Sequence, residues 1–448
     1  MRLALALLSS ILLAGSVISQ QGTQGQFITE LKKRETAAKN DPKALVECAN
    51  YAKSKGLNQD FQRLMNKVLK LDPDNEAAHL GLGFRKYKGK WLLKKDADAA
   101  EKSDTEAEMK AKGLEWIEGA WVQKEHAADA KKGIFHYESE VVSKEEYKLL
   151  QGGTKVRHPR TGELIDKADA EKAAKQFLLG DGKWGDEAEA NKYHSDLGRP
   201  WLVRSYHCTL LSNLPLAEIE ALKGPCDEAA ELLKTLFGEM PSPTHRPVVF
   251  VVSGEDYKEL GARIGDEGST YGAFFAAGTL TMPGQPEMRP AVFDNMKDWG
   301  PYHARHAVGL AFAQGIAAGR GIDFPLWFER GVGGLAERFY TDGVAAHFGK
   351  SHLGRGGVNL APAFFKNYSI NAELQKPEIE HQIYQAGLNL AFSMRAGNKD
   401  ATAALQALVA SFDKGQKAVD AAFAAFEKVL ITNEKAMREY LKSVTSKS

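Results

Sequence analysis

Apolar side chains recur at helical spacing early in the chain. In the segment FQRLMNKVLKL, one face collects the apolar side chains of Phe61, Leu64, Met65, Val68 and Leu69. The preceding segment, NDPKALVECANYAKSKGL, begins and ends like a helix, because Asp41 can cap it, Pro42 suits its first position and Gly56 can close it. The pattern predicts two consecutive helices.

From Pro200 onward, strand patterns come first and helical patterns come after them. WLVRSYHCTLL alternates, RPVVFVVS is a continuous β-branched run suited to a buried strand, and TYGAFFAAGTLTMPG contains two short strands around a glycine turn. Helical patterning covers residues 299–318, 326–340, 380–394 and 401–442. A few strands followed by a run of helices predict the α+β fold class, with a small mixed sheet and a mostly helical C-terminal domain.

The two N-terminal helices resemble a tetratricopeptide unit. They end in LDPDNEAAH, and the resemblance covers about one and a half repeats, residues 41–87, without the usual tryptophan near the start. Such units need stacked neighbours for stability, so this one is expected to pack against the next segment of the chain. The resemblance also implies a surface that can bind a protein partner.

A charged stretch, residues 89–199, separates the two patterned regions. GKWLLKKDADAAEK at Gly89 and GAWVQKEHAADAKK at Gly119 share Gly-x-Trp followed by a charged, alanine-rich helix, and GKWGDEAEANK at Gly182 is a weaker copy. We expect a helical connector in which buried tryptophans anchor exposed helices. Stacking of a ligand on Trp91 or Trp121 is the alternative.

The charge balance and the N-terminal segment indicate which classes of partner and which cellular location to expect. Lysine plus arginine number 59 and aspartate plus glutamate 58, so no net field favours nucleic acid or an anionic membrane. Residues 1–19, with Arg2 before an apolar run, have the pattern of a secretory signal peptide, which predicts a secreted or periplasmic protein. An N-terminal anchor is the alternative, and no later apolar run is long enough to span a membrane.

The chain has three cysteines, Cys48, Cys208 and Cys226, and no Cys-x-x-Cys. A cysteine-based metal or redox site is therefore not expected. Cys208 and Cys226 are the candidate disulfide pair, because both lie in one predicted domain of an exported protein. Three buried free thiols are the alternative.

Residues from about 201 to the C-terminus resemble the gluzincin zinc metallopeptidases of the peptidase MA-like group. The resemblance rests on five segments in order: RPVVFVV with EDYKEL, GAFFAAGTL, YHARHAVGLAF, PLWFERGVGGLAERF and IYQAGLNLAFSM. In that family, His-Glu-x-x-His supplies two zinc ligands and a general base, and a glutamate on a later helix completes the ligands. Zinc then keeps one position open for water or substrate.

This sequence departs from the family at most of these positions. His306 matches the first ligand, but Ala307 replaces the base and Leu310 the second ligand. Arg330 stands where the family has its ligand glutamate, and Glu329 is one residue away, a rotation of about 100° on a helix. Arg330 is expected to form an ion pair with Glu329 or Glu337 where zinc would otherwise lie.

Two histidines leave an altered metal site as the alternative. His303 and His306 are neighbours on one helix face, with β-carbons about 5–6 Å apart. With Glu329 or Glu337 they are candidate zinc ligands in another geometry. The competing expectation is that His303 is exposed and His306 is a core histidine against the acidic helix.

These patterns define four regions: a signal peptide (1–19), a tetratricopeptide-like helical region (20–88), a charged connector (89–199) and a gluzincin-like domain (200–448). The function they favour is non-catalytic binding or scaffolding, with no cofactor. The resemblance implies an edge at Gly272, Ala273, Phe274 and Phe275 to which an extended peptide adds as a strand. The alternatives are an atypical zinc metallopeptidase and a spacer whose helical front binds another exported protein. Partner identity and oligomeric state stay open.

Overall fold

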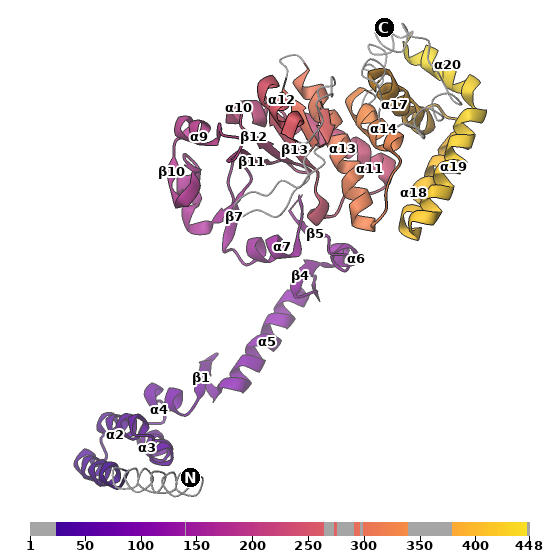
Figure 1. The fold of residues 1–448 in the computed structure, drawn as a ribbon. Helices are drawn as coiled ribbons and strands as arrows, with labels where there is room; N and C mark the ends of the chain where they lie inside the picture. Colours follow the sequence, from indigo (N-terminus) through magenta and orange to yellow (C-terminus); the bar gives the residue numbers. More distant parts are fainter. Residues whose placement is uncertain are drawn as a thin grey trace, which may run out of the picture. The chain divides into compact units, whose positions relative to one another are not determined.

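The computed structural model describes residues 24–138, 140–263, 273–275, 291–295, 299–338 and 379–445. The predicted signal peptide and Gly272 lie outside the described residues. The chain divides into two compact units, residues 1–115 and 116–448, and each is described by itself (Figure 1).

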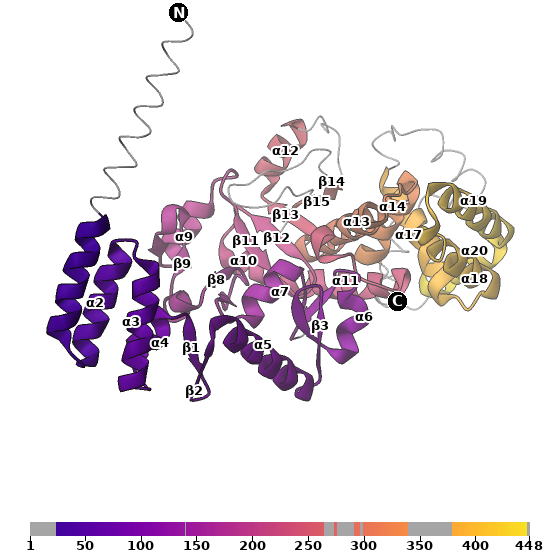
Figure 2. The same cartoon turned by 90° about the horizontal axis from the view of Figure 1, so that it is seen from below.

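The first unit is built on antiparallel helices. A helix over residues 24–38 is followed by α2 (Pro42–Ser54), α3 (Asn58–Leu71) and α4 (Glu76–Gly81), and α2 packs along α3 (Figure 2). The predicted cap is confirmed, because the Asp41 side chain accepts a hydrogen bond from the Lys43 backbone N–H at 3.0 Å and Pro42 opens the helix. The predicted apolar face of α3 forms the core of this unit together with Leu45 and Ala49 of α2.

The charged stretch folds as a repeated unit, a short β-hairpin followed by a helix. The hairpins are β1–β2 (Phe84–Tyr87, Lys90–Leu93), β3–β4 (Leu114–Ile117, Ala120–Gln123), β5–β6 (Phe135–Tyr137, Glu140–Val142), β7–β8 (Lys155–Arg157, Leu164–Asp166) and β9–β10 (Phe177–Leu178, Trp184–Gly185). The helical segments after them are α5 (Lys94–Ala111), η1 with α6 (Lys124–His126, Ala127–Ala130), α7 (Lys144–Gln151), η2 with α8 (Lys167–Asp169, Ala170–Ala173) and α9 (Glu187–His194).

The turns explain why the chain reverses at these points. Lys88 and Gly89 have φ of 46° and 80°, and Glu118 and Gly119 have 51° and 84°. Two consecutive positive φ angles are typical of the type I′ turn, whose twist matches that of paired strands. The prediction of a helical connector is therefore wrong in part, since strands alternate with its helices. The tryptophans were also expected to be buried, whereas Trp91 and Trp121 lie half-buried on second strands.

Five strands form the one larger sheet among the described residues, in the order β11-β12-β13-β15-β14. β11 (Trp201–Arg204) runs antiparallel to β12 (Thr209–Ser212), and β12, β13 (Val248–Val252) and β15 (Ala291–Asp294) are parallel. β14 (Ala273–Phe275) closes the order, antiparallel to β15. The predicted small mixed sheet is confirmed. The second strand expected after β14 lies outside the described residues.

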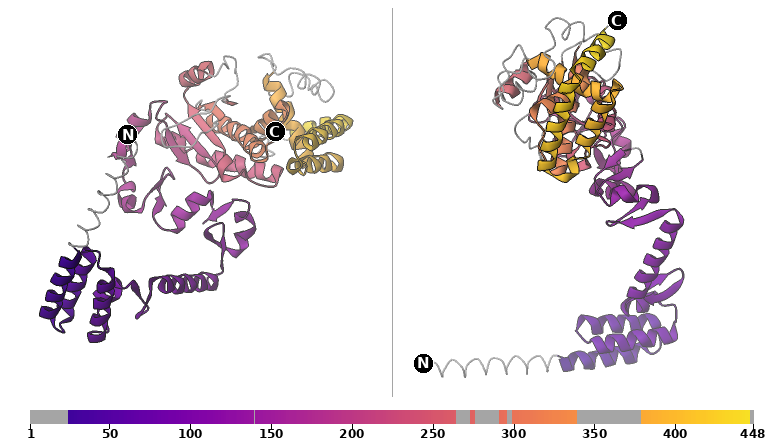
Figure 3. Two further views of the ribbon diagram at one scale, coloured as in Figure 1. Left: turned by 60° about the horizontal axis from the view of Figure 1, so that its bottom comes forward. Right: turned by 90° about the vertical axis from the view of Figure 1, so that its right-hand side faces the viewer.

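The chain after the sheet is mostly helical, as predicted. The helices of this domain are α10 (Leu216–Glu220), α11 (Lys223–Phe237), α12 (Gly254–Arg263), α13 (Gly300–Arg320), α14 (Leu326–Arg338), α17 (Ile379–Arg395), α18 (Lys399–Val409), α19 (Gln416–Thr432) and α20 (Glu434–Thr445). Figure 3 shows α13 and the helices after it gathered beside the sheet, and one apolar core joins the two layers. No helix among the described residues is both long and apolar enough to cross a membrane.

All three cysteines are buried thiols. Cys208 Sγ donates to the backbone carbonyl oxygen of Cys226 at 3.8 Å, so the candidate disulfide pair does lie close together. Burial raises the pKa of Cys208 to about 12 and that of Cys226 well above its ordinary value. Both thiols are therefore protonated and unreactive in this state.

Glu163 lies at the turn of hairpin β7–β8 with its carboxyl group withdrawn from water. Burial raises the pKa of Glu163 to about 7, and a hydrogen bond from Thr161 Oγ1 at 3.2 Å opposes that rise. An unfolded glutamate ionises near its ordinary pKa of 4.5. As pH rises from there to about 7, the unfolded state releases its proton first and the folded state loses stability.

We therefore expect Glu163→Gln to raise the free energy of unfolding by about 2–3 kcal/mol at pH 8, and by little at pH 5. Urea denaturation at both pH values measures this. Glu171→Gln, at an exposed position of α8, is the matched control and should change nothing at either pH. A gain from Glu163→Gln that is equal at the two pH values would contradict the explanation.

Candidate functional site

Helices α13 and α14 cross at a contact between glycines. A β-carbon added at Gly309 would lie 2.6 Å from the Gly333 Cα and 2.8 Å from the Val332 carbonyl oxygen. On another face of α14, a β-carbon at Gly331 would lie 3.1 Å from the Ala386 backbone of α17. Glycine inside a helix lowers stability by about 1 kcal/mol relative to alanine. The close approach of the helices explains why glycine nevertheless occupies these positions.

The crossing encloses a hydrogen-bonded pair, His306 of α13 and Glu337 of α14. His306 Nδ1 lies 2.8 Å from Glu337 Oε2, and both side chains are 0% exposed. Gly333 makes room for the ring, because a β-carbon there would lie 2.8 Å from His306 Nε2. Burial lowers the pKa of His306, although the hydrogen bond to Glu337 opposes the shift. The imidazole is therefore neutral at pH 7.

Glu329 makes a separate contact further along α13. Gln314 Nε2 donates a hydrogen bond to Glu329 Oε1. Burial raises the pKa of Glu329 to about 7, while the hydrogen bond from Gln314 and the charge of Arg330 lower it. Gln314 is two turns beyond His306, about 12 Å along the helix axis, which places Glu329 away from the His306–Glu337 pair.

Of the four candidate metal ligands, the structure brings together His306 and Glu337. Among the described residues, no three of His303, His306, Glu329 and Glu337 lie within reach of one ion. The expectation for His303 is wrong, because its side chain is buried, at 7% exposure. The expectation that His306 is a core histidine against the acidic helix is confirmed.

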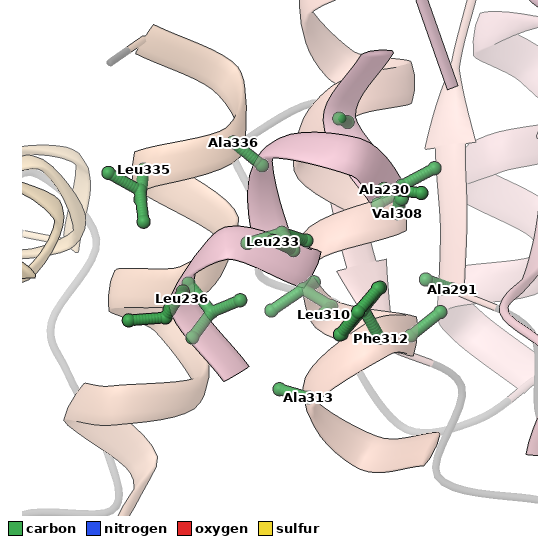
Figure 4. Packing of buried hydrophobic residues seen from close by; sticks show 14 of the residues in the cluster. Ala230, Leu233, Leu236, Ala291, Val308, Leu310, Phe312, Ala313, Leu335 and Ala336 are labelled. Carbon is green, nitrogen blue, oxygen red and sulfur yellow. The ribbon is translucent and has the colours of Figure 1, made fainter. Parts of the chain in front are cut away.

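Ala307 and Leu310, which the resemblance aligns with a general base and a zinc ligand of the gluzincins, belong to the apolar core. Ala307 is 0% exposed and Leu310 is 3% exposed. Figure 4 shows Leu310 among Leu233 of α11 and Phe312 and Ala313 of α13. Neither side chain can bind a metal or accept a proton, and the packing around them contributes stability instead.

The predicted peptide-binding edge is a strand beside the same helix. Ala273, Phe274 and Phe275 form β14 and pair with Phe293, Val292 and Ala291 of β15. Helix α13 contacts both β14 and β15. The structure therefore places β14 beside the helix that carries His306.

Sequence reasoning missed the glycines of the crossing and the role of Gln314. The signal for the glycines was present, because Gly309 and Gly333 interrupt otherwise good helical patterns, and an isolated glycine in such a pattern often marks close packing. A polar residue on a largely apolar helix, such as Gln314, likewise needs a partner when it is partly buried.

Comparison with known proteins finds no relative: no family model, no curated protein and no solved structure matches the chain. The geometry itself must therefore support any assignment of function. It defines a mixed α+β protein in which a short edge strand lies beside a helix with a buried histidine.

Proposed function

We propose that this chain is an exported, non-catalytic binding protein with a gluzincin-like domain, which holds an extended peptide by adding it as a strand to β14. The observation that carries the proposal is the position of β14, which ends the strand order among the described residues and contacts α13. In the gluzincins that the sequence resembles, an edge strand beside the metal pairs with the extended substrate. Strand addition uses backbone hydrogen bonds for affinity and alternate side chains for specificity.

The chemistry of the α13–α14 region favours binding over catalysis. A zinc peptidase needs three protein ligands and an open position for water. Here Ala307 and Leu310 supply neither ligand nor base, and the fully buried His306 is hydrogen-bonded to Glu337. Zinc binding at this pair would require breaking that hydrogen bond and admitting water into the core.

The test is binding of linear octapeptides to the full chain, with hits from an arrayed library measured by fluorescence anisotropy. We expect saturable binding that weakens at least tenfold in Phe274→Pro, because proline distorts the strand and removes an N–H. Lys86→Pro, in the short strand β1 of the other unit, is the matched control and should bind as the unmodified chain does.

N-methylation of successive peptide amides provides a second readout. Alternate backbone amides of an added strand face the protein, so we expect loss of binding at every second position. Absence of saturable binding by any peptide, or loss that does not alternate, would overturn the proposal.

The alternative function, an atypical zinc metallopeptidase, would use His306 and Glu337, the two candidate ligands that the structure brings together. The loss or retention of zinc in His306→Ala, compared with the unmodified chain, distinguishes the two proposals. A peptidase of this kind would lose one zinc per chain and all hydrolysis in His306→Ala. Peptide binding that persists in His306→Ala without hydrolysis would support the non-catalytic function.

A further inference from the structure

A second group of polar side chains lies in the hairpin–helix units, outside the α13–α14 region. It consists of His126, the last residue of η1, Asp129 of α6 and His136 of β5. One ligand atom from each residue lies within 4.8 Å of the other two. Among the described residues, no other group of three or more histidine, cysteine, aspartate or glutamate side chains has its ligand atoms this close together.

The local fold holds the three side chains together. The Asp129 backbone carbonyl accepts hydrogen bonds from Lys132 N at 2.9 Å and Ile134 N at 3.0 Å, which turn the chain back from α6 into β5 (Figure 1). Beneath the turn, Ala130 and Phe135 are buried. The cluster itself is open to solvent, with side-chain exposures of 33% for His126, 45% for Asp129 and 24% for His136.

Contacts within the cluster hold the three side chains close together. His136 Nε2 lies 2.9 Å from Asp129 Oδ2. The two imidazole rings stack, with centroids 4.1 Å apart and planes at 17°. Glu125 adds a second carboxylate, with Oε1 3.6 Å from His126 Nε2.

A sister unit in the same chain shows that the fold does not require these residues. The segment η2–α8 has the same lengths as η1–α6, and Ala170 and Ala173 match Ala127 and Ala130. Asp169 and Lys172 then stand at the positions of His126 and Asp129. Phe177 is buried like Phe135, so Leu178 stands at the position of His136, after a loop that is one residue shorter. The sister unit therefore has neither histidine, and it has Lys172 at the position of Asp129.

We propose that His126, Asp129 and His136 bind a divalent first-row transition metal, with zinc as the physiological choice. Two imidazoles and one carboxylate form a ligand set common for zinc, and three protein ligands leave a fourth position for water or Glu125. The bound ion would join α6 to β5 and stiffen this hairpin–helix unit. The inference does not depend on the peptide-binding proposal.

The test is equilibrium dialysis of the full chain against zinc chloride, with cobalt chloride as a spectroscopic probe. We expect one zinc per chain, a ligand-field absorption on cobalt binding and a higher melting temperature with zinc. His136→Leu, which installs the residue that the sister unit carries, should fold and weaken zinc binding at least tenfold. Asp129→Ala should do the same.

One control separates this site from other metal binding. Asp169→Ala, at the position of the sister unit that matches His126, should bind zinc normally. Zinc uptake that is absent, or that is unchanged in both His136→Leu and Asp129→Ala, would overturn the inference.

Discussion

Replacing His306 with leucine is expected to lower the free energy of unfolding by about 3–5 kcal/mol. The substitution removes the hydrogen bond that Glu337 makes at 2.8 Å in a region where neither side chain is exposed. Removing one partner of a fully buried ionisable pair typically has an effect of this size, because the remaining group stays withdrawn from water and loses this hydrogen bond. Urea denaturation at pH 7, followed by tryptophan fluorescence, measures the change.

A double substitution tests whether His306 and Glu337 stabilise the fold as a coupled pair. Glu337→Leu alone should have a similar effect, whereas His306→Leu with Glu337→Leu should recover much of the loss, since two apolar side chains then face each other. Glu434→Leu, which breaks the exposed pair with Arg438 on α20, is the control and should cost less than about 1 kcal/mol. Equal costs at Glu337 and Glu434, or additive effects in the double variant, would contradict a coupled buried pair.

Gly309→Val is expected to destabilise the α13–α14 crossing by about 3 kcal/mol or more, and Gly309→Ala by about 1–3 kcal/mol. The new β-carbon would lie 2.6 Å from the Gly333 Cα and 2.8 Å from the Val332 carbonyl oxygen, and these backbone atoms cannot move aside as a flexible side chain can. Helix propensity alone predicts the opposite sign, a gain of up to about 1 kcal/mol for alanine. Thermal and urea unfolding decide between the two.

The same helix offers a matched comparison. At Gly319 the nearest atom to an added β-carbon is His245 Nδ1 at 3.7 Å, an ordinary contact. Gly319→Ala should therefore leave stability unchanged or increase it by a few tenths of a kcal/mol. If Gly309→Ala and Gly319→Ala behaved alike, the close crossing would not be the reason for Gly309.

Elements with strong apolar periodicity were predictable from the sequence. The run RPVVFVVS contains β13, and the predicted helix at residues 299–318 corresponds to α13. The run 401–442 was less well predicted, because three helices share it. Gly415, with φ of 82°, comes directly before α19, and Asn433 separates α19 from α20. An amphipathic pattern that continues in register across a short break gives no sign of a change in direction.

The hairpins were not predicted, because their strands and turns lack the usual sequence signals. Their strands have two to four residues, too few for an alternating pattern to be recognised. Their turns use Lys88-Gly89 and Glu118-Gly119 instead of Asn-Gly or Asp-Gly, the usual signal.

Sequence reasoning identified the residues of the candidate site but not their pairing. His306, Glu329 and Glu337 were all candidates, yet only the crossing of two helices decides which carboxylate reaches the ring. That crossing depends on the missing side chains of Gly309 and Gly333. A pattern of apolar positions gives the face that a helix buries, and it leaves the angle and distance of its neighbour undetermined.

The hairpin–helix units have a consequence for the order in which the chain folds. Each hairpin joins residues close in sequence, as when Tyr87 pairs with Lys90, whereas the larger sheet pairs Thr209 with Val248 and Val249 with Ala291. Closing short loops is fast, and contacts between distant residues form slowly. During synthesis, which proceeds from the N-terminus, we expect the N-terminal helices and the hairpins to form before the last strands of the larger sheet have been made. The slow step of folding, and the window for aggregation, would then belong to the C-terminal domain.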